Sequence, residues 1–241
     1  MTALELAQIF DHTALKPETS ELQIAQLCEE AREFHFWSVC VAPSWVAYAK
    51  ERLARSGVKV DTVIGFPHGN TTSSAKAFEA EQMLLAGADE LDLVLNVGLL
   101  KSGAHTKVFA DIFEVVQVAR RRQGVLVKVI LETALLTQEE KIAGAEIAVR
   151  AGADFVKTST GFGPAAATIA DVALLRRVVG SKIGVKASGG IRDLQTALAM
   201  VQAGATRLGA SSSVAIMRQF ADSERARADG GASRGGVIQG M

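Results

Sequence analysis

The chain has 241 residues and 49% hydrophobic side chains, enough for one large domain with a substantial core. Its 26 Lys and Arg balance 26 Asp and Glu, so no net charge attracts a nucleic acid or a membrane surface. The two cysteines are too few for a disulfide scaffold, and no apolar run reaches membrane-spanning length. The N-terminus lacks a signal-peptide pattern, and we expect a cytoplasmic protein.

A short sequence, AGAD or AGAT, occurs at 86–89, 151–154 and 203–206. Each copy follows a helical pattern and precedes an apolar stretch, and its glycine suits the left-handed turn at a helix end. The repeat therefore marks the turn from a helix into a strand. Applied to the whole chain, it predicts strands at 8–13, 38–42, 59–65, 90–96, 125–132, 155–160, 183–188 and 206–210.

Eight strands alternating with helices in 241 residues predict an α/β protein with a (β/α)8 TIM barrel. A doubly wound open sheet is the alternative, but no GxGxxG motif follows the first strand. We expect a single barrel domain over 1–220. The helix and strand pattern then stops, and residues 221–241, rich in Gly, Ala, Ser and charge, are expected to form a flexible tail.

Two of the predicted strands carry a lysine in an apolar run that ends in small residues. FVKTSTGF (155–162) contains Lys157, and GVKASGG (184–190) contains Lys186. Burying two like charges on adjacent strands is costly. Such burial favours a neutral amine, which is a nucleophile. The pair therefore points to an enzyme that forms a Schiff base.

Alternation along the strands predicts which other side chains face the barrel interior. In ELDLVLN (90–96) the leucines share the face toward the helices, so Asp92 points inward. The same alternation turns Lys128 inward, and Asp11 can do likewise. The alternative is an ion-pair network with only a structural role, but such networks stabilise weakly. Charged clusters in clefts are more often catalytic.

Glycine and serine residues follow the last three predicted strands. In barrels, backbone N–H groups in these loops and at a short helix N-terminus commonly hold phosphate. The four histidines show neither HxH nor HExxH spacing, so we expect no metal site. The predicted phosphate-binding residues are Gly161, Gly189, Gly190, Gly209, Ser211 and Ser212.

The segments ELDLVLNVG, KVILET, FVKTSTGF, GVKASGGIR and RLGASSS occur in this order at barrel spacing. Over about residues 5–220 the chain resembles deoxyribose-phosphate aldolase, a class I aldolase family. The resemblance implies a lyase that cleaves 2-deoxy-D-ribose 5-phosphate reversibly to D-glyceraldehyde 3-phosphate and acetaldehyde, in deoxyribonucleotide catabolism. It also implies a homodimer or homotetramer that needs no cofactor.

The resemblance assigns roles to single residues. Lys157 matches the lysine that forms the imine, Lys186 the second lysine that assists it, and Asp92 the carboxylate of the proton relay. The remaining matches are polar substrate-binding positions, Asp11, Lys128 and Thr160, and the glycines and serines of the phosphate site. Many family members also end in a tyrosine that reaches the active site, whereas the only tyrosine here is Tyr48. The resemblance therefore does not support proton transfer by a C-terminal tyrosine in this chain.

Three other functions remain open from the sequence. Another lysine aldolase or a transaldolase would use a ketone or a longer donor instead of acetaldehyde. A barrel isomerase or synthase acting on a phosphorylated sugar would need a carboxylate but no imine. A sugar-phosphate-binding protein without activity would keep the glycine loops but would have no use for the inward lysines.

Overall fold

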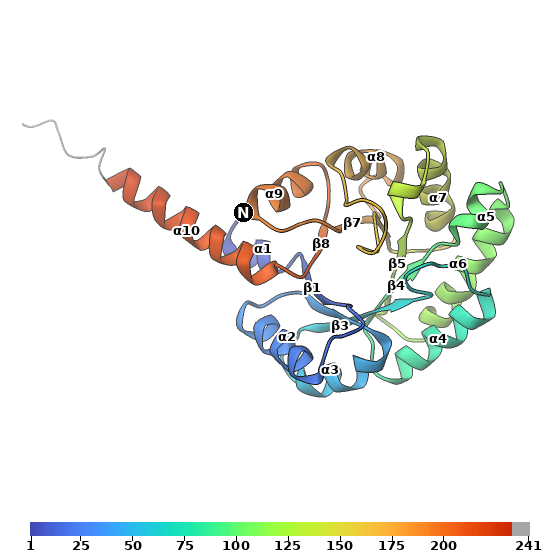
Figure 1. Cartoon of the computed structure of the whole chain (residues 1–241), viewed down its shortest axis with the longest axis horizontal. Helices are drawn as coiled ribbons and strands as arrows, with labels where there is room; N and C mark the ends of the chain where they lie inside the picture. Colours follow the sequence, from blue (N-terminus) through green and yellow to red (C-terminus); the bar gives the residue numbers. More distant parts are fainter. Residues whose placement is uncertain (233–241) are drawn as a thin grey trace, which may run out of the picture.

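The computed structural model describes residues 1–232, and its strands form one closed parallel barrel in chain order (Figure 1). The last strand pairs with the first, through Asp11 and Gly209 among others. All eight strands lie within the ranges predicted from the sequence, to within a residue, so the predicted barrel is confirmed. They are β1 Phe10–Ala14, β2 Ser38–Val41, β3 Lys59–Ile64, β4 Glu90–Val94, β5 Leu126–Ile130, β6 Phe155–Lys157, β7 Gly184–Ser188 and β8 Arg207–Ala210.

Helices surround the ring of strands (Figure 1). Most begin at a Ser, Thr or Asp, and the Thr72, Thr168 and Asp193 side chains accept hydrogen bonds from first-turn N–H groups. They are α1 Ala3–Ala7, α2 Glu21–Glu33, α3 Val46–Arg52, α4 Ser73–Leu85, α5 Val97–Lys101, α6 His105–Arg120, α7 Gln138–Arg150, α8 Ile169–Val179, α9 Leu194–Gln202 and α10 Ser213–Ala232, with short 3-10 helices η1 Pro43–Trp45 and η2 Thr133–Leu135.

The AGAD and AGAT repeats form the turns between helices and strands, as predicted. Gly87, Gly152 and Gly204 have φ values of 107°, 92° and 110°. A side chain at Gly204 would also meet a neighbour, because its Cβ would lie 2.6 Å from Cγ of Arg176. Glycine therefore both adopts the left-handed turn and lets a side chain of the neighbouring helix α8 approach.

The two faces of the barrel strands differ in polarity. Leu91, Leu93 and Leu95 are fully buried against the helix layer. The opposite face of the same strand carries Glu90 and Asp92, which are also buried. This division confirms the predicted alternation and gives the barrel a charged interior.

Helix α10 extends further than the sequence indicated. The predicted tail begins at residue 221, but α10 continues to Ala232 and projects from the barrel (Figure 1). Helix-favouring residues and a 2.8 Å ion pair between Arg227 and Glu224, three positions apart, account for this extension. Residues 233–241 lie outside the described part of the chain, so the division into a barrel domain and a flexible tail stays a prediction.

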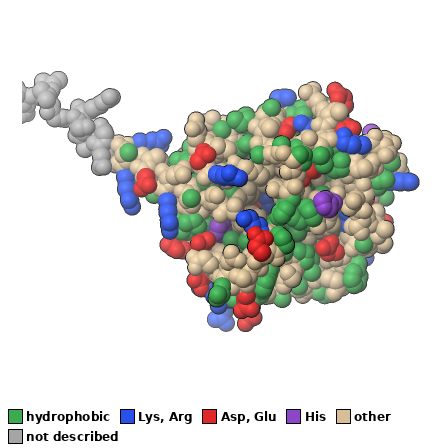
Figure 2. Space-filling model, viewed as in Figure 1, with side chains coloured by type: hydrophobic (Ala, Val, Ile, Leu, Met, Phe, Trp, Pro, Cys, Tyr) green, Lys and Arg blue, Asp and Glu red, His purple; other side chains and the backbone are tan. Residues whose placement is uncertain are grey.

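The face drawn in Figure 2 mixes charged and hydrophobic side chains, and the basic residues of α10 are arginines. Over residues 1–232, no helix combines the length and hydrophobicity needed to cross a membrane.

Candidate active site

Three neighbouring strands bring the three predicted lysines together. Register pairs Lys157 on β6 with Lys186 on β7, and Lys128 on β5 lies two positions before the residue that pairs with Lys157. All three side chains are at most 2% exposed. Because side chains on this face of parallel strands converge inside a closed barrel, the lysines meet in the interior.

Asp92 is the centre of this cluster. Its Oδ2 accepts hydrogen bonds from Lys157 and Lys186, each at 2.7 Å, and its Oδ1 accepts one from Lys128 at 2.8 Å. Burial opposes ionisation of this carboxyl, but the three ammonium groups outweigh burial and hold its pKa well below the usual value. Asp92 therefore stays an anion that can accept and release protons between the lysines.

Three further carboxylates lie on the other side of Lys128 and Lys186. Lys186 Nζ lies 2.5 Å from Asp11 and 3.0 Å from Asp61, and Lys128 Nζ lies 3.0 Å from Asp61 and 2.7 Å from Glu90. Burial alone would favour neutral amines, but the carboxylates outweigh it and raise the pKa values of Lys128 and Lys186. Both lysines therefore remain cations.

Arg207 closes the amino-terminal end of the barrel. It lies 2.7 Å from Asp11 and 3.0 Å from Glu90, and its guanidinium carbon lies 4.6 Å and 5.3 Å from the ring centres of Trp37 and Phe155. Trp37 in turn donates a 2.6 Å hydrogen bond to Glu90. Since Arg207 is only 5% exposed, this layer separates the charged interior from solvent at that end.

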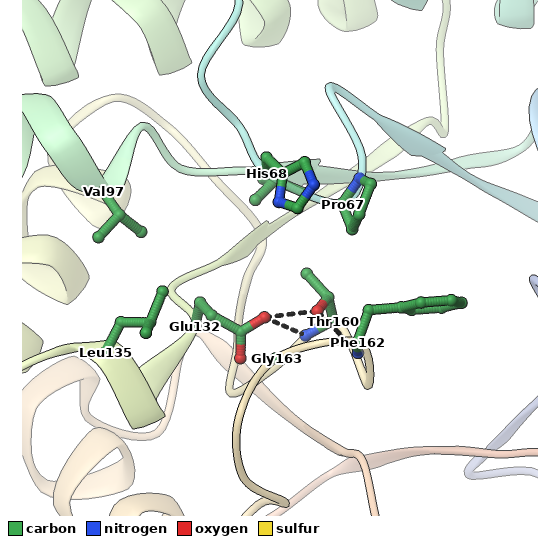
Figure 3. Close-up of a pocket in the computed structure, with 9 residues that line it drawn as sticks. Pro67, His68, Val97, Glu132, Leu135, Thr160, Phe162 and Gly163 are labelled. Atoms are coloured by element: carbon green, nitrogen blue, oxygen red, sulfur yellow. Dashed lines mark hydrogen bonds between the residues drawn. The ribbon is translucent and has the colours of Figure 1, made fainter.

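A pocket with an open volume of about 390 Å³ lies at the opposite, carboxyl end of the strands. Its lining comes from the end of β4 and from the segments that follow β3 to β6, and Figure 3 shows residues of these different segments around the pocket. It includes Thr160, one of the predicted substrate-binding residues. The lining is Pro67, His68, Val94, Val97, Glu132, Leu135, Thr160, Phe162 and Gly163.

Glu132 holds Thr160 in this pocket (Figure 3). Its Oε2 accepts a 3.1 Å hydrogen bond from the Thr160 amide and a short one from the Thr160 hydroxyl. Glu132 has a φ of 56°, a left-handed conformation that costs energy for a non-glycine residue and is common at functional sites. Gly163 leaves room for the carboxylate, because a Cβ there would lie 2.7 Å from its Cδ.

The predicted phosphate loops converge only in part. A Cβ at Gly189 would lie 3.7 Å from Cα of Gly161, and Ala167 donates a 3.2 Å backbone hydrogen bond to Gly189. The loops after β6 and β7 therefore lie side by side. Gly161, Gly189 and Gly190 have φ values of 86°, 92° and 78°, which favour glycine.

The remaining predicted phosphate residues lie on β8 and just after it. Gly209 is within the strand, where a Cβ would lie 2.9 Å from Cβ of Ser188 and 3.1 Å from Cε of Lys186. Its position thus makes room for Lys186. Ser211 is exposed and Ser212 is half-buried, directly before the first turn of α10.

Sequence reasoning missed Asp61, Glu90 and Arg207, and it gave Glu132 no role. The alternation of side chains could have identified Asp61, which is a single carboxylate inside strand β3.

Two sets of side chains have possible metal-ligand atoms within 4.8 Å of one another. They are Cys40 with Asp61 and Asp92, and Asp11 with Asp61 and Glu90. Their carboxylates already bind ammonium groups, so a metal ion would have to displace these cations.

Comparison with known proteins shows what this chain is similar to. The profile of the DeoC/LacD family of aldolases matches residues 6–220. A deoxyribose-phosphate aldolase of Halalkalibacterium halodurans is 57% identical over 213 residues, which cover 88% of this chain and 94% of that protein. One from Geobacillus is 55% identical over 212 residues, covering 88% of this chain and 94% of that protein.

A solved structure, the tetrameric deoxyribose phosphate aldolase from Aeropyrum pernix, superposes with a TM-score of 0.85 at 34% identity, covering 91% of this chain and 92% of that one. The family match spans the whole barrel, including the strands that carry Lys157, Lys186 and Asp92. This chain belongs to the DeoC/LacD family of aldolases.

Proposed function

We propose that this protein is a deoxyribose-phosphate aldolase, a class I aldehyde-lyase that reversibly cleaves 2-deoxy-D-ribose 5-phosphate to D-glyceraldehyde 3-phosphate and acetaldehyde. One observation carries the proposal. Lys157 is a buried lysine near the carboxyl end of β6, and its Nζ contacts a carboxylate shared with a second lysine. The close relatives bear the same activity in their names.

The chemistry begins with the neutral amine of Lys157, which attacks the substrate aldehyde. Water leaves, and the protonated imine that forms draws electrons from the adjacent carbons. The C2–C3 bond then breaks, because the imine accepts its electron pair as an enamine while the C3 hydroxyl loses its proton, and D-glyceraldehyde 3-phosphate departs. Protonation of the enamine and hydrolysis of the imine release acetaldehyde and restore Lys157.

Asp92 and Lys186 move the protons in this scheme. Asp92 Oδ2 lies between the two amines at 2.7 Å from each, which is the reach that general acid–base catalysis requires. Lys186, whose pKa is raised, supplies a proton, and Asp92 accepts and returns one. Lys128 and Asp11 hold these two groups in place through the contacts described above.

Substrate binding uses the loops at the carboxyl end. Thr160 contacts a substrate hydroxyl, and the backbone around Gly161, Gly189 and Gly190, with Ser211 and Ser212, binds the phosphate. Binding of this remote group orients the reacting carbons over Lys157. We assign Gly209 to the same site, where it contributes by leaving space for Lys186. The proposal needs no metal or organic cofactor, and we expect a homodimer or homotetramer that acts in deoxyribonucleotide catabolism in the cytoplasm.

Borohydride reduction in the presence of acetaldehyde, followed by peptide mass mapping, tests this function. We expect an ethyl adduct on Lys157 and on no other lysine. A folded protein without an adduct would reject the imine mechanism. An adduct that forms only with a ketone donor would instead favour a transaldolase-like activity.

A further inference from the structure

Asp61 is a buried carboxylate to which the proposed mechanism gives no role. It lies in the middle of β3 with no exposed surface. Its Oδ2 lies 3.0 Å from Lys186 Nζ, and its Oδ1 lies 3.0 Å from Lys128 Nζ. Asp61 therefore contacts Lys186, the lysine that assists Lys157. Among the described residues, Lys157 itself forms its ion pair with Asp92 and not with Asp61.

The charges of the barrel interior balance when every group is ionised. The cations are Lys128, Lys157, Lys186 and Arg207, and the carboxylates are Asp11, Asp61, Glu90 and Asp92. Attack on an aldehyde requires a neutral amine at Lys157, which would leave one buried negative charge without a partner. Such a charge is strongly unfavourable. A carboxylate that takes up the proton removes this imbalance.

Asp61 is the carboxyl best placed to take that proton. The pKa values of Asp11 and Asp92 are both lowered, since their cationic neighbours outweigh burial. At Asp61, burial and repulsion from Asp92 outweigh the attraction of Lys128 and Lys186 and raise the pKa to about 6. The titratable groups that face Asp61 are Asp11 on β1, Cys40 on β2, Glu90 and Asp92 on β4, Lys128 on β5 and Lys186 on β7.

A continuous series of contacts joins Asp61 to the nucleophile. Lys157 Nζ lies 2.7 Å from Asp92 Oδ2, that oxygen lies 2.7 Å from Lys186 Nζ, and Lys186 Nζ lies 3.0 Å from Asp61 Oδ2. We propose that Asp61 is the internal proton acceptor of this site, which stores the Lys157 proton before attack and returns it when the imine forms. This inference rests on the proposed imine mechanism.

The proton moves without any change in the charge of the interior. Lys186 donates a proton to Asp61, while Lys157 releases one to Asp92, which passes it to Lys186. The result is a neutral amine at Lys157 and a carboxylic acid at Asp61. After the amine adds to the aldehyde, the carbinolamine loses its hydroxyl group as water and takes the stored proton. The positively charged imine then replaces the original ammonium group, and Asp61 is ionised again.

Infrared difference spectroscopy of the full chain, with and without acetaldehyde, tests this role. Because Asp61 holds the stored proton in the free enzyme and imine formation ionises it, we expect the C=O band of a carboxylic acid to decrease in the wild type. The band change should be absent in Asp61→Asn. It should persist in the control Glu90→Asp, which alters another buried carboxylate that contacts Lys128 but keeps the charge balance of the interior and lies outside the contact series.

A second measurement is the pH dependence of imine formation. Asp61→Asn leaves the interior with one surplus cation, so a lysine loses its proton more readily and the acid limb of the profile should move to lower pH. If Asp61 had a purely structural role, Asp61→Asn would lower the rate of imine formation without moving the acid limb of the pH profile. An unmoved acid limb therefore overturns the proposal.

Parallel borohydride trapping separates this inference from the proposed function. An adduct on Lys157 without a change of the acid band in the wild type overturns the role of Asp61 alone, even if Asp61→Asn does not fold. A band change that remains in Asp61→Asn also overturns it. The absence of an adduct overturns both the imine mechanism and the role of Asp61.

Discussion

Lys157 and Lys186 donate hydrogen bonds to the same atom, Oδ2 of Asp92, each at 2.7 Å. One carboxylate oxygen thus lies within direct reach of both amines. Because each proton transfer between the lysines passes through this oxygen, we expect the two lysines to act as a unit whose single variants are not additive.

Replacing Lys186 with Met should lower kcat for sugar-phosphate cleavage by about 10²–10⁴-fold, the usual loss for a general acid–base group. Steady-state kinetics measures this loss. Lys141→Met is the control, because Lys141 forms a 2.6 Å ion pair with Asp171 on the outside of the barrel. Equal activity of the two variants would remove Lys186 from the mechanism.

Glu132→Leu should raise KM for the sugar phosphate, since the Thr160 amide and hydroxyl lose their acceptor. Glu132→Gln keeps an acceptor oxygen and should retain most of the affinity. Trapping of acetaldehyde on Lys157 should change little in either variant, because this small donor does not need Thr160. If both variants lost binding equally, the carboxylate charge would matter more than its hydrogen bonds to Thr160.

Gly209→Ala should impair catalysis without a backbone penalty, because φ at this position is not in the left-handed region. The added methyl group would lie 2.9 Å from Cβ of Ser188 and 3.1 Å from Cε of Lys186, and would displace these side chains. Gly98→Ala is the matched control, since its Cβ would lie at an ordinary 3.6 Å from Oδ1 of Asn96. Activity assays of both proteins, with circular dichroism to confirm folding, measure the difference.

The buried pair of Lys76 and Asp111 should be important for stability. Lys76 donates a 2.6 Å hydrogen bond to Asp111 and a 2.9 Å hydrogen bond to the carbonyl of Val94, which lines the pocket. Lys76→Met should reduce the free energy of unfolding by about 3–5 kcal/mol, because it leaves a buried charge unpaired. The double variant Lys76→Met/Asp111→Leu should recover much of this loss in urea unfolding, and a further loss would contradict the account.

Asp61 and Asp11 should affect stability with opposite dependence on pH. The pKa of Asp61 rises from its usual 3.8 to about 6, so its favourable contribution is present at low pH and is lost as pH rises through that interval. The pKa of Asp11 is lowered, so its contribution is present above its usual pKa and is lost in acid.

Urea unfolding at several pH values tests these signs. Relative to the wild type, Asp61→Asn should gain stability between pH 4 and pH 7, as the ionisation of Asp61 becomes costly in the wild type. Asp11→Asn should be less stable than the wild type by a nearly constant amount over the same range, and this difference should shrink only in acid, below the usual pKa of the group. If the free energy of unfolding relative to the wild type changed with pH in the same way for both variants, this would contradict the difference between the two carboxyls.

Alternation and the AGAD repeat were sufficient to predict the barrel and the meeting of Asp92 with three lysines. The same reasoning missed Glu90 and Arg207, because each is the first residue of its strand and strand ends are poorly defined by sequence. It could not give Glu132 a role, since the left-handed turn that aims its carboxylate at Thr160 follows from packing against Gly163. The helical residues of α10 after 220 lacked a hydrophobic pattern, because that part of the helix projects from the barrel.

The Arg207 layer has a kinetic consequence. With the amino-terminal end filled by Arg207, Trp37 and Phe155, reactants and released water share the opening at the carboxyl end. In the synthetic direction, a phosphorylated acceptor seated in that opening would block the way to Lys157. We therefore expect ordered addition, with acetaldehyde entering first and excess D-glyceraldehyde 3-phosphate acting as a competitive inhibitor of the donor.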